Sequence, residues 1–295
     1  MGDQEPEDGA VPADLENGDE GAPKKRKLEK PKKADYRQRA HCNPLSDSYI
    51  EYPIAPGHVD WSQHYPEIFG VVSEEPLRPW NTSELMVKYP SEPVDPSKNA
   101  KDGKKVTMVD VGCGFGGLLV ALGPLYPDKL ILGMEIREQV TTYVGERILA
   151  LRAEHEGKSY TNCSVLRTNV MKFLVNYFQK GQLEKMFFCF PDPHFKRKNW
   201  RRRIISEGLL SLYAYALCEG GLLYAITDVK DLFDWMYTSC KGHLLFEEVP
   251  VDEMKDDPAF KAIHNATEEG MKVLREQRPM WSCVFRRLPD PPLPL

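Results

Sequence analysis

The 295-residue sequence contains no C-x-x-C pair, no H-E-x-x-H pattern and no apolar run that approaches the length of a membrane span. Its seven cysteines are scattered, and several stand inside apolar runs. This usage argues against a zinc site or a disulfide framework and favours a reduced compartment. A membrane helix needs roughly 18 apolar residues. We therefore expect a soluble protein with no secretory leader, no membrane association and no bound metal.

Charge is distributed unevenly along the chain. The formal net charge is −5 at pH 7, yet eight of the 44 acidic residues lie within residues 1–22, which contain no Lys or Arg. The remaining chain has 39 basic residues against 36 acidic ones. A mildly basic body permits a nucleic-acid ligand without requiring one.

Composition divides the chain into four segments. Residues 1–35 are rich in Pro, Gly and charge, which predicts a disordered tail, and the PKKRK run at 23–27 predicts a nuclear-import signal or, alternatively, a basic arm that touches RNA. Residues 36–69 have irregularly spaced aromatics and prolines, which favours an arm packed on the body. Residues 70–104 are rich in proline and predict a variable loop of little function. Residues 105–290 form the main domain.

From residue 105 onward, strand and helix patterns alternate. The first buried strand is expected at 106–111, and a glycine-rich turn and a helix follow it. This alternation predicts a doubly wound, mostly parallel α/β sheet. Further strands are expected at 130–134, 163–167, 186–190, 222–227, 244–250 and 282–287, with helices at about 138–154, 172–178, 204–218 and 231–240.

The glycine-rich turn allows two cofactor classes. Gly112, Gly114 and Gly117 satisfy G-x-G-x-x-G, so a nicotinamide-dependent oxidoreductase is one reading. Asp110 converts the pattern to D-x-G-x-G. A carboxylate there suits the amino group of S-adenosylmethionine and is badly placed beside a pyrophosphate, which is bound by amide donors. Glu135 ends the second strand about 20 residues further on, where a carboxylate can accept hydrogen bonds from ribose hydroxyls.

A Pro-Asp-Pro clamp follows the apolar strand at 186–190. Its prolines fix their own φ and push the preceding residue towards extended geometry, so Asp192 is held at the end of a buried strand. Open α/β sheets bind ligands at this edge. An acid beside a dense cationic cluster predicts chemistry on a polyanion, and the alternative is a strand end followed by a solvated basic helix start. The cluster consists of Lys196, Arg197, Lys198, Arg201, Arg202 and Arg203.

Five motifs together resemble one family. They are YRQRAH at 36–41, DVGCGFGG at 110–117, LGMEIR at 132–137, FPDPHFKR at 190–197 and TEEG at 267–270. The order and sequence of these motifs closely resemble the eukaryotic tRNA (guanine-N(7)-)-methyltransferases. The resemblance implies a Rossmann-like class I methyltransferase fold with an antiparallel final strand, and S-adenosyl-L-methionine as cofactor. It also implies tRNA as substrate, with the variable-loop guanosine as target, and a heterodimer with a non-catalytic WD-repeat subunit.

The resemblance also assigns roles to residues. The catalytic acid falls on Asp192. The tRNA contacts are expected at Arg37 and Arg39, which alternate along an extended segment, and in the basic cluster at 196–203. From spacing alone, the TEEG motif is a helix N-cap followed by acids in the first turn. The cofactor contacts fall on Gly112, Glu135, Ile136, Arg137, Asn169, Val170, Cys189, Thr267 and Glu269.

The implied reaction needs little acid–base chemistry. The N7 atom of guanine carries a lone pair and no proton, so the protein has to align the base and hold it still. The methylated ring is cationic, and a carboxylate such as Asp192 stabilises that charge as it develops. His194 has no proton to abstract and is expected to be structural or to contact RNA. A non-catalytic RNA-binding scaffold is the remaining alternative.

Overall fold

The computed structural model describes residues 28–38, 42–46, 49–80 and 88–292. The predicted import signal and Arg39 lie outside these ranges. The described chain forms a seven-stranded sheet with the order β3-β2-β1-β4-β5-β7-β6. The strands are β1 (Val106–Val111), β2 (Leu130–Glu135), β3 (Cys163–Arg167), β4 (Leu183–Cys189), β5 (Leu217–Thr227), β6 (Phe246–Val249) and β7 (Trp281–Arg287).

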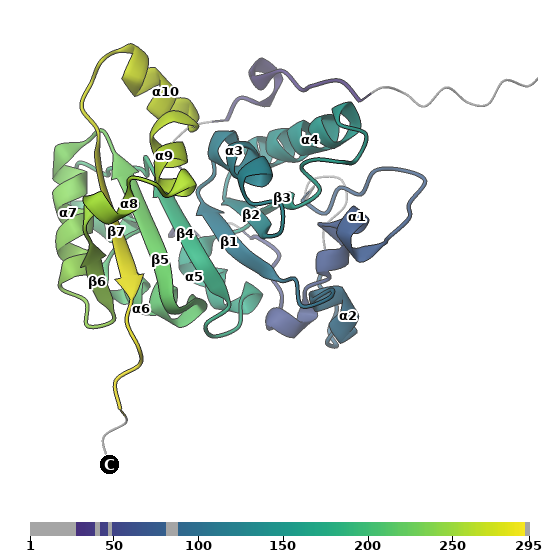
Figure 1. The fold of residues 1–295 in the computed structure, drawn as a ribbon, viewed down its shortest axis with the longest axis horizontal. Coiled ribbons are helices and arrows are strands. Elements are labelled where there is room, and N and C mark those ends of the chain that lie inside the picture. Colours follow the sequence, from purple (N-terminus) through teal and green to yellow (C-terminus); the bar gives the residue numbers. More distant parts are fainter. Residues whose placement is uncertain (1–27, 39–41, 47–48, 81–87, 293–295) are drawn as a thin grey trace, which may run out of the picture.

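The sheet is parallel except at one edge. Strands β1 to β5 pair in parallel, and β7 pairs antiparallel with both β5 and β6. The order reverses between β1 and β4, so their carboxyl ends form the crevice in which doubly wound proteins bind ligands. The predicted doubly wound class with an antiparallel final strand is confirmed. Figure 1 shows β7 running against its neighbour β5.

Helices cover both faces of the sheet, and each face has its own apolar core. Alternation along β2 divides the strand between them: Leu132 and Met134 belong to one core, and Ile131 belongs to the other. Helices α5, α6 and α7 pack on the first core, whereas α3, α4 and α9 pack on the second. Helix α9 packs next to α3, and α10 follows α9 at the top of the view in Figure 1. The helices are α1 (Pro66–Phe69), α2 (Pro96–Asn99), α3 (Gly117–Leu125), α4 (Glu138–Glu154), α5 (Val170–Tyr177), α6 (Glu207–Ala216), α7 (Lys230–Lys241), α8 (Val251–Met254), α9 (Pro258–Asn265) and α10 (Glu268–Arg275).

The segment before α1 is part of the first core. Trp61 and Tyr65 are fully buried, and the Tyr65 hydroxyl donates to the main-chain oxygen of Ile131, 3.0 Å away. His64 is buried beside them, with Nδ1 2.9 Å from the Ser164 hydroxyl, and burial lowers the pKa of His64 to about 3. A neutral imidazole there stabilises the packing of this segment on β3.

Part of the predicted variable loop is firmly packed. The indole of Trp80 is only 3% exposed and lies against Gly145 of α4. A Cβ at position 145 would lie 1.8 Å from the indole Cε2, so only glycine leaves room for this ring. Arg78 forms an ion pair with Glu146, with 2.6 Å between Nε and Oε1. Arg78 and Trp80 of this segment therefore stabilise the outer side of α4.

Several element boundaries differ from the sequence predictions, among them the start of β5, which lies at Leu217 and not at 222, and two of the differences lie next to the Pro-Asp-Pro clamp. Strand β4 ends at Cys189, because Phe190 takes a left-handed conformation with φ of +51° and leaves the strand plane. The helix predicted from residue 204 begins at Glu207, and the basic residues before it form the short 3-10 helix η4 (Arg197–Arg202). In the described ranges no helix has the length and apolarity to cross a membrane, and no group of His, Cys, Asp and Glu is placed to hold a metal ion.

Candidate active site

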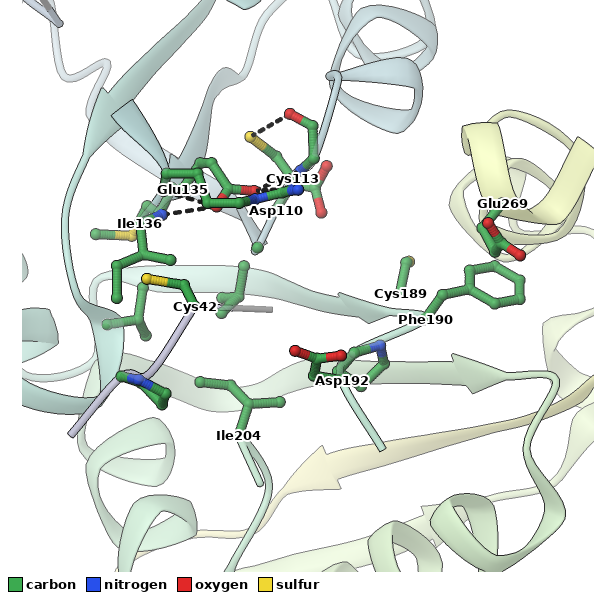
Figure 2. A pocket seen from close by; sticks show the side chains of 18 of the residues that line it. Cys42, Asp110, Cys113, Glu135, Ile136, Cys189, Phe190, Asp192, Ile204 and Glu269 are labelled. Carbon is green, nitrogen blue, oxygen red and sulfur yellow. Dashed lines mark hydrogen bonds and ion pairs between the residues drawn. The ribbon is translucent and has the colours of Figure 1, made fainter. Parts of the chain in front are cut away.

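A cavity of about 550 Å³ opens at the carboxyl ends of β1, β2, β4 and β5. Figure 2 shows Asp110 and Glu135 on one side of this cavity and Asp192 on another, with Cys42 of the N-terminal segment between them. A second cavity of about 410 Å³ shares Asp192 and Arg202 with the first. The predicted site residues that line the first cavity are Gly112, Glu135, Ile136, Arg137, Asn169, Val170, Cys189, Asp192, Arg202, Thr267 and Glu269.

The glycine loop exposes backbone to the cavity. Gly112 has φ of +71°, and nothing lies within 4 Å of the place where a Cβ would stand, so its open side faces the cavity it lines. Gly116 has φ of +77°, and a Cβ there would lie 2.8 Å from a methyl group of Val144. The loop thus needs glycine for its left-handed conformation and for its approach to α4.

Glu135 is held by a dense set of donors. Its side chain is 4% exposed and accepts hydrogen bonds from the backbone N–H groups of Gly114 (3.1 Å), Ile136 (2.9 Å) and Arg137 (3.0 Å). The Arg137 guanidinium adds contacts at 3.1 and 2.9 Å. The carboxylate is therefore oriented before any ligand binds, as a group that accepts hydrogen bonds from ribose should be.

Asp110 and Glu268 make the other side of the cavity acidic. Asp110 is 2% exposed, and burial, with the negative charges of Glu268 and Glu135, raises its pKa to about 8. Glu268 accepts from the Gly117 N–H and from Arg147 at 3.1 Å each, and it pairs with Lys33 of the N-terminal segment at 3.1 Å. A dinucleotide pyrophosphate binds at such a helix N-terminus. Here the start of α3 is already occupied by a carboxylate, which argues against a nicotinamide cofactor.

The remaining predicted cofactor residues have structural contacts as well. Asn169 is the N-cap of α5, and its side chain also donates to the Pro44 oxygen at 2.6 Å. Thr267 caps α10 by accepting from the Gly270 N–H at 2.9 Å, which confirms the predicted N-cap. Glu269 pairs with Lys272 at 3.0 Å. Burial raises the pKa of the Cys189 thiol, so this group is a neutral part of the wall.

The residues on either side of the Pro-Asp-Pro clamp have an unusual backbone conformation. Phe190 and His194 both take left-handed φ values, +51° and +46°, which are rare for residues with side chains. The Phe190 N–H donates to the Ile226 oxygen at 2.8 Å, so the turn begins from a fixed point on the sheet. Asp192 is half-buried and lines both cavities. The geometry thus places this carboxylate at the boundary between the first cavity, which contains the glycine loop, and the second cavity.

The basic cluster divides into three environments. Lys196, Arg197, Lys198 and Arg201 are exposed, and Arg202 is half-buried at the wall shared by both cavities. Arg203 is 4% exposed, and its guanidinium lies 4.8 Å from the ring centres of both Trp200 and Trp235. This burial argues against the predicted contact of Arg203 with tRNA, because its guanidinium packs against the two rings. Arg37 is exposed just after the 3-10 helix η1 (Lys33–Tyr36) and is not among the residues that line either cavity.

Several lining residues were missed in the sequence. Asp228 follows the last residue of β5, as the Pro-Asp-Pro clamp follows β4, and this position after a buried strand was the available signal. Its carboxylate pairs with Arg278. Cys42, Phe190 and Ile204 also line the cavity. No local pattern marks Cys42 and Ile204, which only the fold brings to this place, whereas Phe190 opens the FPDPHFKR motif.

A family model described as "Putative methyltransferase" matches residues 104–283. Together with the strand order and the glycine-lined, acidic cavity, this match defines the chain as a class I methyltransferase. A tRNA (guanine-N(7)-)-methyltransferase of Candida glabrata is 52% identical over 88% of this chain and 83% of its own length, and that of Caenorhabditis briggsae is 49% identical over 89% and 91%. The corresponding protein of Zea mays is 50% identical over 88% and 93%. The chain belongs to the tRNA (guanine-N(7)-)-methyltransferases, and it is an enzyme of tRNA modification.

Among solved structures, the 16S rRNA methyltransferase KamB has a TM-score of 0.43 at 12% identity over 63% of this chain and 89% of its own. That likeness is too weak to support a functional argument. The family membership confirms the activity predicted from the motifs. It leaves no support for the oxidoreductase or for the non-catalytic scaffold.

Proposed function

We propose that this chain transfers the methyl group of S-adenosylmethionine to N7 of the variable-loop guanosine of tRNA. We further propose that it does so in the nucleus, as the catalytic subunit of a heterodimer with a WD-repeat protein. The observation that carries the reaction is the convergence of the glycine loop, Glu135 and Asp192 on one cavity, with Arg202 on its wall. The partner and the target position rest on the resemblance of the sequence motifs, and the compartment rests on the basic run at 23–27.

The lining residues fit this cofactor. Glu135 is oriented for ribose hydroxyls, and the apolar walls at Ile136 and Val170 suit an adenine ring. The Glu268 carboxylate beside the glycine loop favours a ligand that carries positive charge, and such a ligand would in turn favour ionisation of Asp110, whose pKa is raised by burial. When bound, S-adenosylmethionine supplies a methyl group activated by a sulfonium centre.

Asp192 then acts on the acceptor. Its carboxylate accepts hydrogen bonds from the ring N–H and the amino group of guanine, which fixes the base in one orientation. As the ring gains positive charge, the same carboxylate stabilises it in a partly desolvated site. The clamp geometry matters here, since an acid that is oriented beforehand needs no reorganisation during the reaction.

The exposed basic residues bind the tRNA backbone. Lys196, Arg197, Lys198 and Arg201 are exposed, follow the loop that carries Asp192 in the chain, and meet phosphates without reading sequence. Arg202 lies at the boundary between the two cavities, where a phosphate next to an extruded guanosine would pass. The affinity for tRNA should therefore decrease steeply with salt.

An exposed apolar strip supports a protein partner. Tyr49 and Ile54 are 73% and 66% exposed, and Tyr52 stacks on Phe173 of α5 with 4.0 Å between ring centroids. Aromatic and aliphatic groups that stay exposed together are typical of protein interfaces. A β-propeller subunit docked on this strip would bury them.

The decisive experiment is a transfer assay with radiolabelled S-adenosylmethionine and unmodified tRNA, with and without the WD-repeat subunit. Nuclease mapping and mass spectrometry of the product locate the modified nucleoside. We expect N7-methylguanosine at one variable-loop position, with higher turnover in the heterodimer. Methylation at another position would overturn the proposed target, and equal turnover without the subunit would overturn the proposed dependence. Replacing Ile54 with Lys should weaken co-purification of the subunit, whereas replacing the exposed Leu244 with Lys, a matched control, should not.

A further inference from the structure

Arg203 differs from the other members of the basic cluster. The neighbouring side chains of Arg202 and Ile204 line the active-site cavity, whereas Arg203 is absent from its lining and is 4% exposed. The chain at Arg203 is extended, with φ of −65° and ψ of 130°, and successive side chains of an extended segment point to opposite sides. Arg203 therefore points into the protein while its neighbours face the cavity.

The buried guanidinium has specific partners. It lies 4.8 Å from the centres of the Trp200 and Trp235 rings, which are themselves 5.3 Å apart. A planar guanidinium stacks on aromatic faces, and this attraction is stronger when water is excluded. The Trp235 indole N–H donates to the main-chain oxygen of Ile205 at 2.8 Å. This bond fixes the Trp235 ring to the chain segment that carries Arg203.

The guanidinium also contacts the Pro-Asp-Pro clamp directly. Its Nε donates to the main-chain oxygen of Pro193 at 3.0 Å, one residue after the acid. Proline cannot donate a hydrogen bond, so this carbonyl is the main-chain anchor available at that position. A cation packed against two adjoining rings, with a donor aimed at the clamp, is a means of fixing the orientation of Asp192.

We infer that Arg203 is a positioning residue for the methyl transfer, which holds Asp192 in place through Pro193 and binds no tRNA phosphate. The inference deepens the proposed function and rests on the role given there to Asp192. It assigns the basic cluster two tasks: the exposed members bind substrate, and Arg203 sets the geometry of the acid. Lysine cannot replace it, because an ammonium group lacks both the planar face and the Nε donor.

The test compares Arg203→Lys with Arg201→Met, a variant of the exposed arginine two residues earlier. In the heterodimer, Arg203→Lys should lower kcat about 10- to 100-fold, the range expected for a misplaced catalytic group. Cofactor affinity, tRNA affinity and its salt dependence should stay at wild-type values. Arg201→Met should instead raise KM for tRNA and reduce the salt slope by about one. Wild-type kcat in Arg203→Lys, or a reduced salt slope, would overturn the inference.

A double-variant cycle tests whether the effect passes through the acid. If Arg203 acts by orienting Asp192, adding Arg203→Lys to Asp192→Asn should cause no further loss of kcat. Losses that multiply would overturn the inference and leave the role of Asp192 intact, whereas wild-type turnover in Asp192→Asn alone would overturn both. If Arg203→Lys does not fold, Trp235→Phe serves instead. It keeps an aromatic face and loses the Ile205 contact, so a smaller fall in kcat at unchanged tRNA affinity is expected, and an unchanged kcat would count against the inference.

Discussion

The ends of β2 and β4 both present an acid to the same cavity, but they hold it in different ways. Glu135, at the end of β2, is surrounded by backbone and guanidinium donors. Asp192, after β4, lies between two prolines, which are themselves flanked by the left-handed residues Phe190 and His194. The Arg203 side chain donates a hydrogen bond to the main-chain oxygen of the second proline. Hydrogen bonds fix the oxygens of the first acid, and the main chain fixes the position of the second. The arrangement at Glu135 suits the recognition of a cofactor that always binds in one pose. The arrangement at Asp192 suits an acid that acts on a base entering from outside.

The largest effect is expected at the β4 end. Asp192→Ala should lower turnover by about 10²–10³-fold, because it removes the charge that stabilises the methylated ring. Calorimetric titration with S-adenosylmethionine should give nearly wild-type affinity. Asp128→Ala, on an exposed loop, is the control. Wild-type-like turnover in Asp192→Ala would remove this residue from the reaction and abolish the contrast between the two ends.

At the β2 end the loss should appear in binding. Glu135→Ala removes an acceptor that is already oriented, and the dissociation constant for S-adenosylmethionine should rise about 10- to 100-fold, the equivalent of one or two charge-assisted hydrogen bonds. At saturating cofactor, kcat should recover. Glu138→Ala, a carboxylate outside the lining of the cavity that pairs with Arg167, should bind cofactor normally. If the two variants bound cofactor equally well, Glu135 would have no part in recognition.

At the β1 end, which carries Asp110, the expected effect is on the pH dependence of stability. Burial raises the pKa of Asp110 from 3.8 to about 8. The folded state therefore binds this proton more tightly than the unfolded state does, so the contribution to stability is present at low pH and is lost as pH rises towards 8. The slope is at most about 1.4 kcal/mol per pH unit. Asp110→Asn should flatten the dependence of Tm on pH between about 5 and 8, and an unchanged profile would contradict the assignment.

The smallest effect is expected on the exposed part of the basic cluster. Lys198→Ala should weaken tRNA binding a few-fold and reduce the slope of affinity against salt by about 0.7–0.9. The measurement is filter binding over a series of salt concentrations. An unchanged slope would place Lys198 outside the tRNA interface. The same series on Glu207→Gln, an exposed acid at the start of α6, provides the comparison.

Patterns with local causes were predictable from the sequence. The strands at 106–111 and 163–167, the helix at 138–154 and the Thr267 cap were located as the structure has them, because periodicity and capping chemistry act over a few residues. The convergence of the glycine loop with the Pro-Asp-Pro clamp followed from the parallel order of the strands.

Features that depend on distant partners were not predictable. Arg203 looked like a solvated cation because the ring that buries it, Trp235, lies on α7, 32 residues further along the chain. The left-handed turn at Phe190 departs from the extended geometry that a following proline favours, and its N–H bonds to Ile226 of a strand distant in sequence, so the apolar run gave no sign of the turn. Asp228 drew no attention because a single acid after a strand is a weak signal.

The indole of Trp80 occupies the space that a Cβ at position 145 would need. The two residues are therefore interdependent across a large sequence separation: a methyl group added to the helix would expel the ring, and loss of the ring would leave an empty groove along α4. A graft that replaces 70–104 with the shorter or longer segment of another protein should retain a folded α4 only when the donor supplies an indole at that place, or when both positions are exchanged together.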